Sequence, residues 1–137
     1  MNVGSEGPAR ILVVDKHPVI RVGLRQLIEQ ESDLSVCGEA DTIERALDAA
    51  VVFDPDLIIV DLALGAEDGV ELIRHLRARY SAVRLLVFSV HDEALFAYLA
   101  LQAGANGYVV KGEPSDHVVH AIREVLAGRT YVSERLR

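Results

Sequence analysis

Short apolar runs alternate with longer amphipathic stretches along most of the chain. Each run is rich in Val, Ile and Leu, which is typical of a strand buried on both faces of a parallel sheet. The intervening stretches place apolar residues three and four positions apart, as in helices that cover a sheet. The predicted strands are 11–14, 34–37, 57–60, 85–88 and 108–110, and the predicted helices are 18–29, 42–52, a segment beginning at 69, 92–103 and 115–128.

Residues that begin or end helices separate these segments. Pro18 suits a first helical turn, the 54–56 segment Asp-Pro-Asp ends the second helix, and Gly104 follows the fourth. Ser115 is expected to cap the last helix, which ends at Gly128. Strands that alternate with helices through short loops indicate a doubly wound α/β fold: a five-stranded parallel sheet with helices on both faces.

Length and composition narrow the class of protein further. The chain has 137 residues, which fits one domain at 9–130 after a flexible tail at 1–8. A net charge of −7 argues against direct binding to nucleic acid, and the single Cys37 excludes an internal disulfide. No apolar run is long enough to span a membrane and the first residues lack a secretory signal, so we expect a cytoplasmic protein.

Polar residues stand where the predicted strands end. Asp15 and Lys16 follow the first strand, Asp61 the third, Ser89 the fourth and Lys111 the fifth, and these two lysines are the only ones in the chain. The carboxyl ends of parallel strands share one edge of a sheet, and the crevice there is the usual functional site of such folds. We therefore expect these side chains to form one site.

This set of side chains suits phosphoryl transfer. Asp61 can attack phosphorus and form an acyl phosphate, provided that nearby cations offset the incoming charge. Lys111 can hold one phosphoryl oxygen and Ser89 can donate a hydrogen bond to another. Magnesium usually assists this chemistry, and Asp15 can supply one carboxylate to it.

Four motifs occur in order along the chain: Ile-Leu-Val-Val-Asp-Lys-His-Pro at 11–18, Asp-Leu at 61–62 with Asp-Gly at 68–69, Phe-Ser at 88–89, and Gly-Ala-Asn-Gly-Tyr-Val-Val-Lys at 104–111. Through these motifs the sequence from about residue 10 to residue 130 resembles the response-regulator receiver domain of two-component signalling. His17-Pro18 and the run Gly-Ala-Asn-Gly-Tyr resemble the subfamily that precedes a LuxR-type helix-turn-helix domain.

The resemblance implies a flavodoxin-like fold and a signalling role rather than an enzyme. Asp61 would accept phosphoryl from a sensor histidine kinase, Ser89 and Tyr108 would report its arrival, and Lys111 would contact it. Mg²⁺ would be held by Asp15 and the backbone oxygen of Ala63. Activation would produce a homodimer that controls transcription, with 131–137 starting a linker to an output domain that binds DNA.

Two positions depart from the family pattern. The family has a second acidic residue after the first strand, where this chain has Lys16, so we expect weak magnesium binding and a pairing of Lys16 with Asp61 in the metal's place. Asp15, Asp61, Lys16 and Lys111 together carry no net formal charge. Glu67, in an altered loop after Asp61, is the candidate replacement carboxylate.

The helix predicted at 92–103 carries apolar residues around most of its circumference. A helix that flanks a sheet cannot bury all of them. Phe96 and Tyr98 are therefore candidates for a dimer or partner surface. The alternative interpretation is that their rings lie flat on neighbouring residues.

Three other functions remain open at this stage. A small aspartyl-phosphate phosphatase would carry a second Asp two positions after its nucleophile, where this chain has Ala63. A nucleotide or flavin module would need a glycine-rich loop after the first strand, where Asp15-Lys16-His17-Pro18 stands instead. A pseudo-receiver, in which Lys16 replaces the metal and phosphorylation plays no part, keeps the fold without the chemistry.

Overall fold

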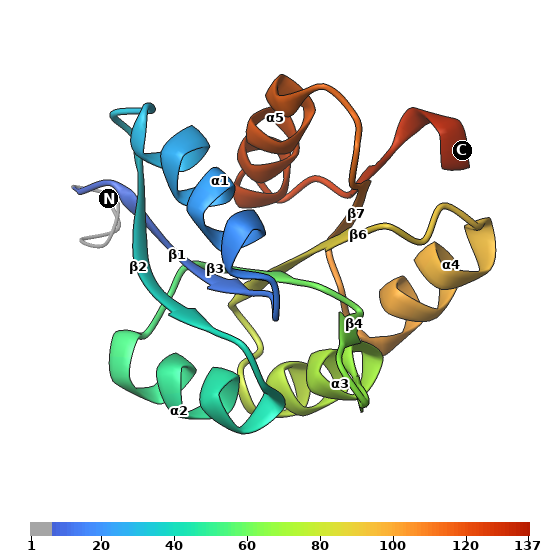
Figure 1. Cartoon of the computed structure of the whole chain (residues 1–137), viewed down its shortest axis with the longest axis horizontal. Helices are drawn as coiled ribbons and strands as arrows, with labels where there is room; N and C mark the ends of the chain where they lie inside the picture. Colours follow the sequence, from blue (N-terminus) through green and yellow to red (C-terminus); the bar gives the residue numbers. More distant parts are fainter. Residues whose placement is uncertain (1–6) are drawn as a thin grey trace.

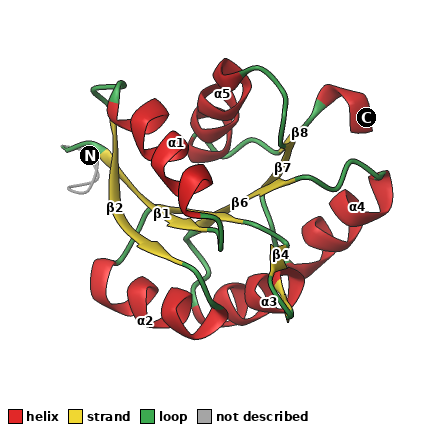
Figure 2. Cartoon of the chain, viewed as in Figure 1, coloured by secondary structure: helices red, strands yellow, loops and turns green. Residues whose placement is uncertain are grey.

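A parallel sheet of six strands in the order β2-β1-β3-β6-β7-β8 forms the centre of the computed structural model (Figures 1 and 2). The structure describes residues 7–137, so most of the predicted tail at 1–8 lies outside the described residues. A small antiparallel pair follows β3. The strands are β1 (Ala9–Val14), β2 (Leu34–Ala40), β3 (Leu57–Val60), β4 (Ala63–Leu64), β5 (Glu67–Asp68), β6 (Arg84–Ser89), β7 (Gly107–Val110) and β8 (Tyr131–Val132).

Helices cover both faces of this sheet, as predicted for a doubly wound fold. Residues of α1 and α5 pack on one face, and residues of α2, α3 and α4 pack on the other (Figure 1). Along β1, Ile11 and Val13 face the first layer, whereas Leu12 and Val14 face the second. The helices are α1 (Pro18–Glu29), α2 (Ile43–Phe53), α3 (Gly69–Arg79), α4 (Ala94–Ala103) and α5 (Ser115–Leu126).

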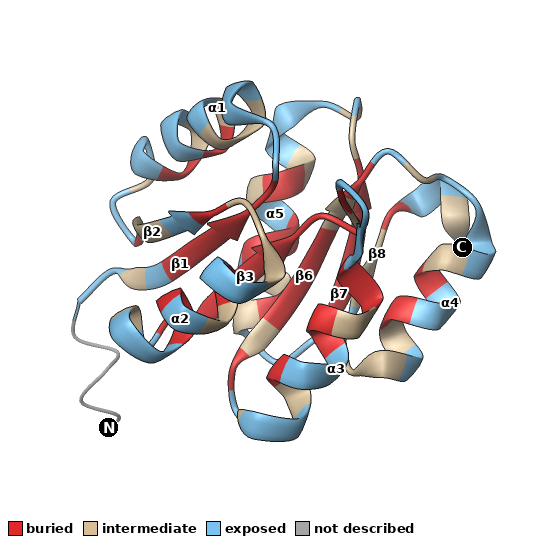
Figure 3. Ribbon diagram, turned by 60° about the horizontal axis from the view of Figure 1, so that its bottom comes forward, coloured by how far each residue is buried: buried red, intermediate tan, exposed pale blue. Residues whose placement is uncertain are grey.

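Burial on both faces explains why the central strands are continuously apolar. All four residues of β3 and of β7 are buried, and Figure 3 shows burial concentrated in the central strands. In a sheet with one solvent face, polar residues would alternate with apolar ones. The apolar runs were therefore sufficient to predict these strands.

The sheet has six main strands rather than the predicted five, because Tyr131–Val132 pairs with β7 as a short edge strand. Ser133, which is buried, holds this strand in place. Its N–H donates to the carbonyl of Tyr108, and its Oγ accepts from the N–H of Val110 at 2.9 Å. A strand of two half-buried residues has no apolar run by which the sequence could show it.

The predicted cap of the last helix is wrong in detail. Ser115 is the first residue of α5, and Pro114 takes the capping position without a side-chain hydrogen bond. Pro114 has the extended backbone angles of a capping residue, so the helix begins one position earlier than it would with a Ser115 cap. The caps of α2 and α3 are conventional: Thr42 accepts from Arg45 N–H, and Asp68 accepts from Val70 N–H.

The topology brings the ends of β1 and β3 together. From β1 the chain passes to β2 on one side and then to β3 on the other, so the strand order reverses between β1 and β3. Val14 is level with Val60, and the N–H of Asp61 donates to the carbonyl of Val14 at 3.0 Å. Asp15 and Asp61 therefore leave the sheet side by side at the switch point, where ligands bind in this class of fold.

At Gly69 the backbone passes close to the backbone of Asp61 and Leu62, which fixes the path of the chain after Asp61. A Cβ at this position would overlap the carbonyl oxygen of Asp61 and lie 2.5 Å from the Cα of Leu62. We expect Gly69→Ala to lower the free energy of unfolding by about 2 kcal/mol, because backbone atoms must move to admit the methyl group. Urea denaturation measures the change.

Gly23 in α1 provides the matched control, since a Cβ there meets nothing within 4 Å. Gly23→Ala should raise the free energy of unfolding by up to about 1 kcal/mol, because alanine has the higher helix propensity. Equal effects of the two substitutions would show that the close approach at Gly69 does not constrain the fold.

Candidate functional site

Lys111 bridges two buried carboxylates at the switch point of the sheet. Its Nζ donates to Asp15 Oδ2 at 2.8 Å and to Asp61 Oδ2 at 3.0 Å. Both aspartates are only 2% exposed, and the Lys111 side chain is 10% exposed. The topology thus brings together three residues that are 46 to 96 positions apart, as the strand-end pattern predicted.

The other carboxylate oxygens are held by the loops that follow β1 and β3. Asp61 Oδ1 accepts from the N–H of Ala63 at 3.1 Å. Asp15 Oδ1 accepts from the N–H of His17 at 2.8 Å and lies 3.1 Å from its Nδ1. Each of the four carboxylate oxygens therefore already has a hydrogen-bonding partner within the chain.

Burial raises the pKa of Asp61 above its ordinary value. The N–H of Ala63 and the ammonium of Lys111 act in the opposite direction, while the neighbouring Asp15 raises the pKa further. A carboxylate removed from water loses hydration that one shared ammonium restores only in part. Asp61 is thus a desolvated carboxyl group whose charge the ammonium of Lys111 offsets.

Ser89 and Tyr108 lie beside this cluster, linked through one turn. Ser89 Oγ accepts from the N–H of His91 at 3.2 Å, and the Tyr108 hydroxyl donates to the carbonyl of His91 at 2.7 Å. Both residues are fully buried, and burial raises the pKa of Tyr108 to about 12. The hydroxyl of Tyr108 is therefore a fixed donor that holds the loop after β6.

Lys16 does not pair with Asp61, contrary to the sequence-based expectation. It is exposed, and within residues 7–137 it forms no ion pair. Its side chain instead reaches the turn between β4 and β5, where a Cβ on Gly65 would lie 3.8 Å from Lys16 Nζ. The cation between the two carboxylates is Lys111. It is far from both in sequence, but the sheet topology places the end of β7 near the ends of β1 and β3.

Glu67 also lies outside the carboxylate cluster. It is exposed, and its Oε1 accepts from the N–H of Ile43 at 3.0 Å, at the start of α2. His17 is not among the site residues predicted from sequence, yet its Nδ1 lies 3.1 Å from Asp15 Oδ1. Pro18, directly after His17, marks the start of α1 and so predicts a turn at His17. That turn was the sequence feature that could have placed His17 near Asp15.

The two interface candidates on α4 have different surroundings. Phe96 is half-buried and stacks on His91, with ring centroids 4.3 Å apart, so its ring packs within the domain. Tyr98 is 60% exposed and Leu95 is 61% exposed. Of the two candidates, only Tyr98 presents its ring to solvent.

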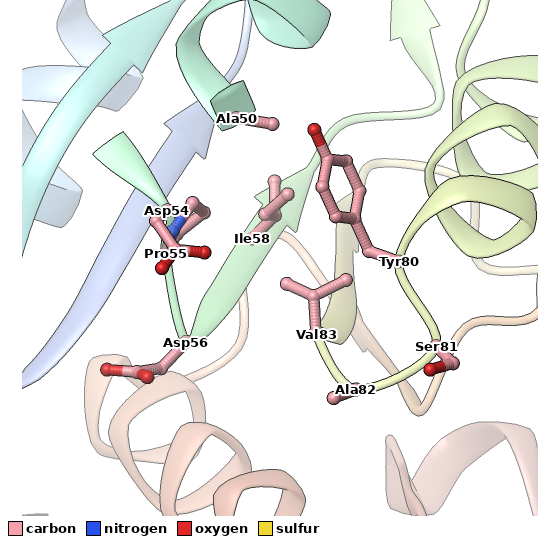
Figure 4. A pocket seen from close by; sticks show the side chains of 9 residues that line it. All are labelled: Ala50, Asp54, Pro55, Asp56, Ile58, Tyr80, Ser81, Ala82 and Val83. Atoms are coloured by element: carbon pink, nitrogen blue, oxygen red, sulfur yellow. The ribbon is translucent and has the colours of Figure 1, made fainter. Parts of the chain in front are cut away.

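A hollow at the opposite edge of the sheet carries none of these residues (Figure 4). It lies between the loop that precedes β3 and the loop that precedes β6, and Tyr80 extends toward Ala50 of α2. The amino ends of parallel strands are remote from the switch-point crevice. This hollow is therefore separate from the aspartate cluster.

Comparison with known proteins identifies the family. Residues 11–123 match the family described as the response regulator receiver domain. The nitrate/nitrite response regulator NarL of Escherichia coli K12 is 36% identical over 134 residues, which cover 98% of this chain and 62% of NarL. Response regulator GacA of Pseudomonas viridiflava is 35% identical over 127 residues, covering 93% of this chain and 59% of GacA.

The chain belongs to the response-regulator receiver family. A crystal structure of a LuxR-family response regulator from Aurantimonas sp. SI85-9A1 is similar to it, with a TM-score of 0.91 and 38% identity over 95% of this chain and 93% of that one. The receiver spans about 60% of the length of the curated relatives it matches. Among residues 7–137, no helix is long and apolar enough to cross a membrane.

Receivers of this family typically bind Mg²⁺, but the residues of this site do not fit a resident magnesium ion. The candidate ligand atoms within 4.8 Å of one another come from Asp15, Asp61 and His17, and an imidazole is a poor ligand for an ion that prefers oxygen. Lys111 Nζ already lies against both carboxylates. Lys16 stands at the family's second acidic position and adds a positive charge.

The raised pKa of Asp61 makes the stability of this receiver depend on pH. The folded protein binds the proton more tightly than the unfolded chain, so stability is lost as pH rises through the folded pKa. Asp61→Asn should therefore raise the melting temperature at pH 7 by roughly 3 °C, equivalent to about 1 kcal/mol. The gain should shrink as pH falls toward about 4, the ordinary range of a carboxyl pKa.

Thermal unfolding followed by circular dichroism measures this difference across pH. Asp48→Asn, on the exposed side of α2, is the matched control and should leave the melting temperature unchanged. A lower melting temperature for Asp61→Asn than for the wild type at pH 7 would contradict the argument that burial dominates at Asp61.

Proposed function

We propose that the chain is the phosphoacceptor receiver of a bacterial response regulator, which takes phosphoryl from a histidine kinase onto Asp61 and acts in the cytoplasm. The observation that carries this proposal is the bridge from Lys111 to Asp15 and Asp61. It combines a desolvated carboxylate with a cation that can remain in contact when the carboxylate becomes an acyl phosphate. Membership of the receiver family supports the same assignment.

The transfer step is a displacement at phosphorus. A carboxylate oxygen of Asp61 forms the new O–P bond while the P–N bond to the kinase imidazole breaks. The bonding electron pair leaves with the imidazole nitrogen, so no oxidant or further reactant is required. The N–H of Ala63 and the ammonium of Lys111 hold the carboxylate in place before the transfer.

Arrival of the phosphoryl group then changes the hydrogen bonds of the loop after β6. Ser89 donates its hydroxyl proton to a phosphoryl oxygen, because a charged acceptor forms the stronger bond. The His91 loop, which the hydroxyl of Tyr108 holds, moves with it and shifts the exposed α4 surface around Tyr98. That surface pairs with a second copy or releases an output domain, through which the regulator binds DNA and controls transcription.

A phosphorylation-independent interaction module is the second candidate function. It is favoured by the partners that every oxygen of Asp15 and Asp61 already has within the chain, together with Lys16 at the altered acidic position. In that case the lysine bridge fixes one conformation permanently. Phosphatase activity toward external esters is disfavoured, because Ala63 supplies no general acid.

Acetyl phosphate and intact-mass spectrometry separate these two functions. We expect a single phosphoryl adduct on the wild type and on Asp48→Asn, and none on Asp61→Asn, because Asp61, buried against the ammonium of Lys111, is the proposed nucleophile. Incubation with a histidine kinase in its phosphorylated form gives the same readout. Failure to form an adduct with either donor, with or without magnesium, would overturn the phosphoacceptor function.

A further inference from the structure

We propose that Lys16 replaces the divalent cation of this site: its ammonium contacts the phosphoryl group on Asp61 and balances the charge that the group adds. The proposal deepens the phosphoacceptor function and rests on it. It makes phosphorylation of this receiver independent of magnesium. Lys16 would then contact the phosphoryl group, at a position where the family has an acidic residue.

The first argument is position. Lys16 follows Asp15 directly, and its side chain runs across to the turn at Gly65, which lies four residues after Asp61. The same loop begins with Ala63, whose N–H is bonded to Asp61. Lys16 therefore reaches from the loop after β1 to the turn in the loop after β3.

The second argument is charge. Asp15 and Asp61 against Lys111 leave one negative charge, which Lys16 neutralises in the resting site. An acyl phosphate at Asp61 replaces a singly charged carboxylate with a group carrying about two negative charges at pH 7. Because the ammonium of Lys111 also pairs with Asp15, it cannot balance the added negative charge alone. A second cation is needed.

The third argument is availability. Arg21 and Arg25 of α1 both pair with Glu39. Lys16 has no ion-pair partner in the described part of the chain, and its four-carbon stem is flexible. An ammonium on the residue next to Asp15 also repels an approaching divalent cation, so Lys16 and magnesium compete for one role.

The test measures the rate of adduct formation with acetyl phosphate, with EDTA or with saturating magnesium, by intact-mass spectrometry. Lys16 is exposed, so substitution there should leave the fold intact. Arg129→Ala is the control for loss of one exposed positive charge, since Arg129 follows α5 at the opposite edge of the sheet and pairs with Glu124.

We expect the wild type and Arg129→Ala to form the adduct at similar rates with EDTA and with magnesium. Lys16→Ala should lower the rate in EDTA by about tenfold, the effect of losing one charge-assisted contact. Lys16→Arg should retain most of the rate, and Lys16→Asp should form the adduct only with magnesium.

Two outcomes would overturn the proposal, and they are distinguishable. A wild-type adduct that requires magnesium, with an unchanged rate for Lys16→Ala, would remove Lys16 from the site while leaving Asp61 as the phosphoacceptor. No adduct on the wild type or on Lys16→Asp, even with magnesium, would overturn the phosphoacceptor function itself and the role of Lys16 with it.

Discussion

The requirement that two buried carboxylates share one ammonium organises the functional edge of this receiver. Asp15 and Asp61 lie almost completely out of water, and Lys111 contacts both. Neither carboxylate could stay ionised at such burial without a nearby cation. The ends of β1, β3 and β7 must therefore remain in register, so the alignment of the sheet and the chemistry of the site depend on the same contact.

Much of this arrangement could be predicted from sequence because parallel sheets impose it. Apolar runs buried on both faces, such as Leu57–Val60, are conspicuous, and the residue after each run falls at one edge of the sheet. Asp15, Asp61, Ser89 and Lys111 could thus be grouped from the sequence alone. The grouping needed only strand positions, which the hydrophobic pattern supplies.

The features that could not be predicted depend on side-chain direction or on isolated hydrogen bonds. A periodic pattern places Lys16 next to Asp15 but does not say that its stem crosses to Gly65 rather than turning toward Asp61. Glu67 accepts a hydrogen bond from the backbone N–H at the start of α2 instead of joining the site. The sequence does not show which of these two positively polarised places its carboxylate occupies. The sixth strand depends on Ser133, one polar residue in a segment that has no apolar run.

Ser133 has a mechanical consequence. Its Oγ donates to Glu113 at 2.9 Å, and Glu113 lies two residues after Lys111, so the segment from Tyr131 onward is attached to the loop that follows the bridging lysine. β8 runs parallel to β7, and a pull on Arg137 along the strand would load their hydrogen bonds in shear, all together, rather than one at a time. Through the Ser133–Glu113 hydrogen bond, such a pull would also act on the loop after Lys111.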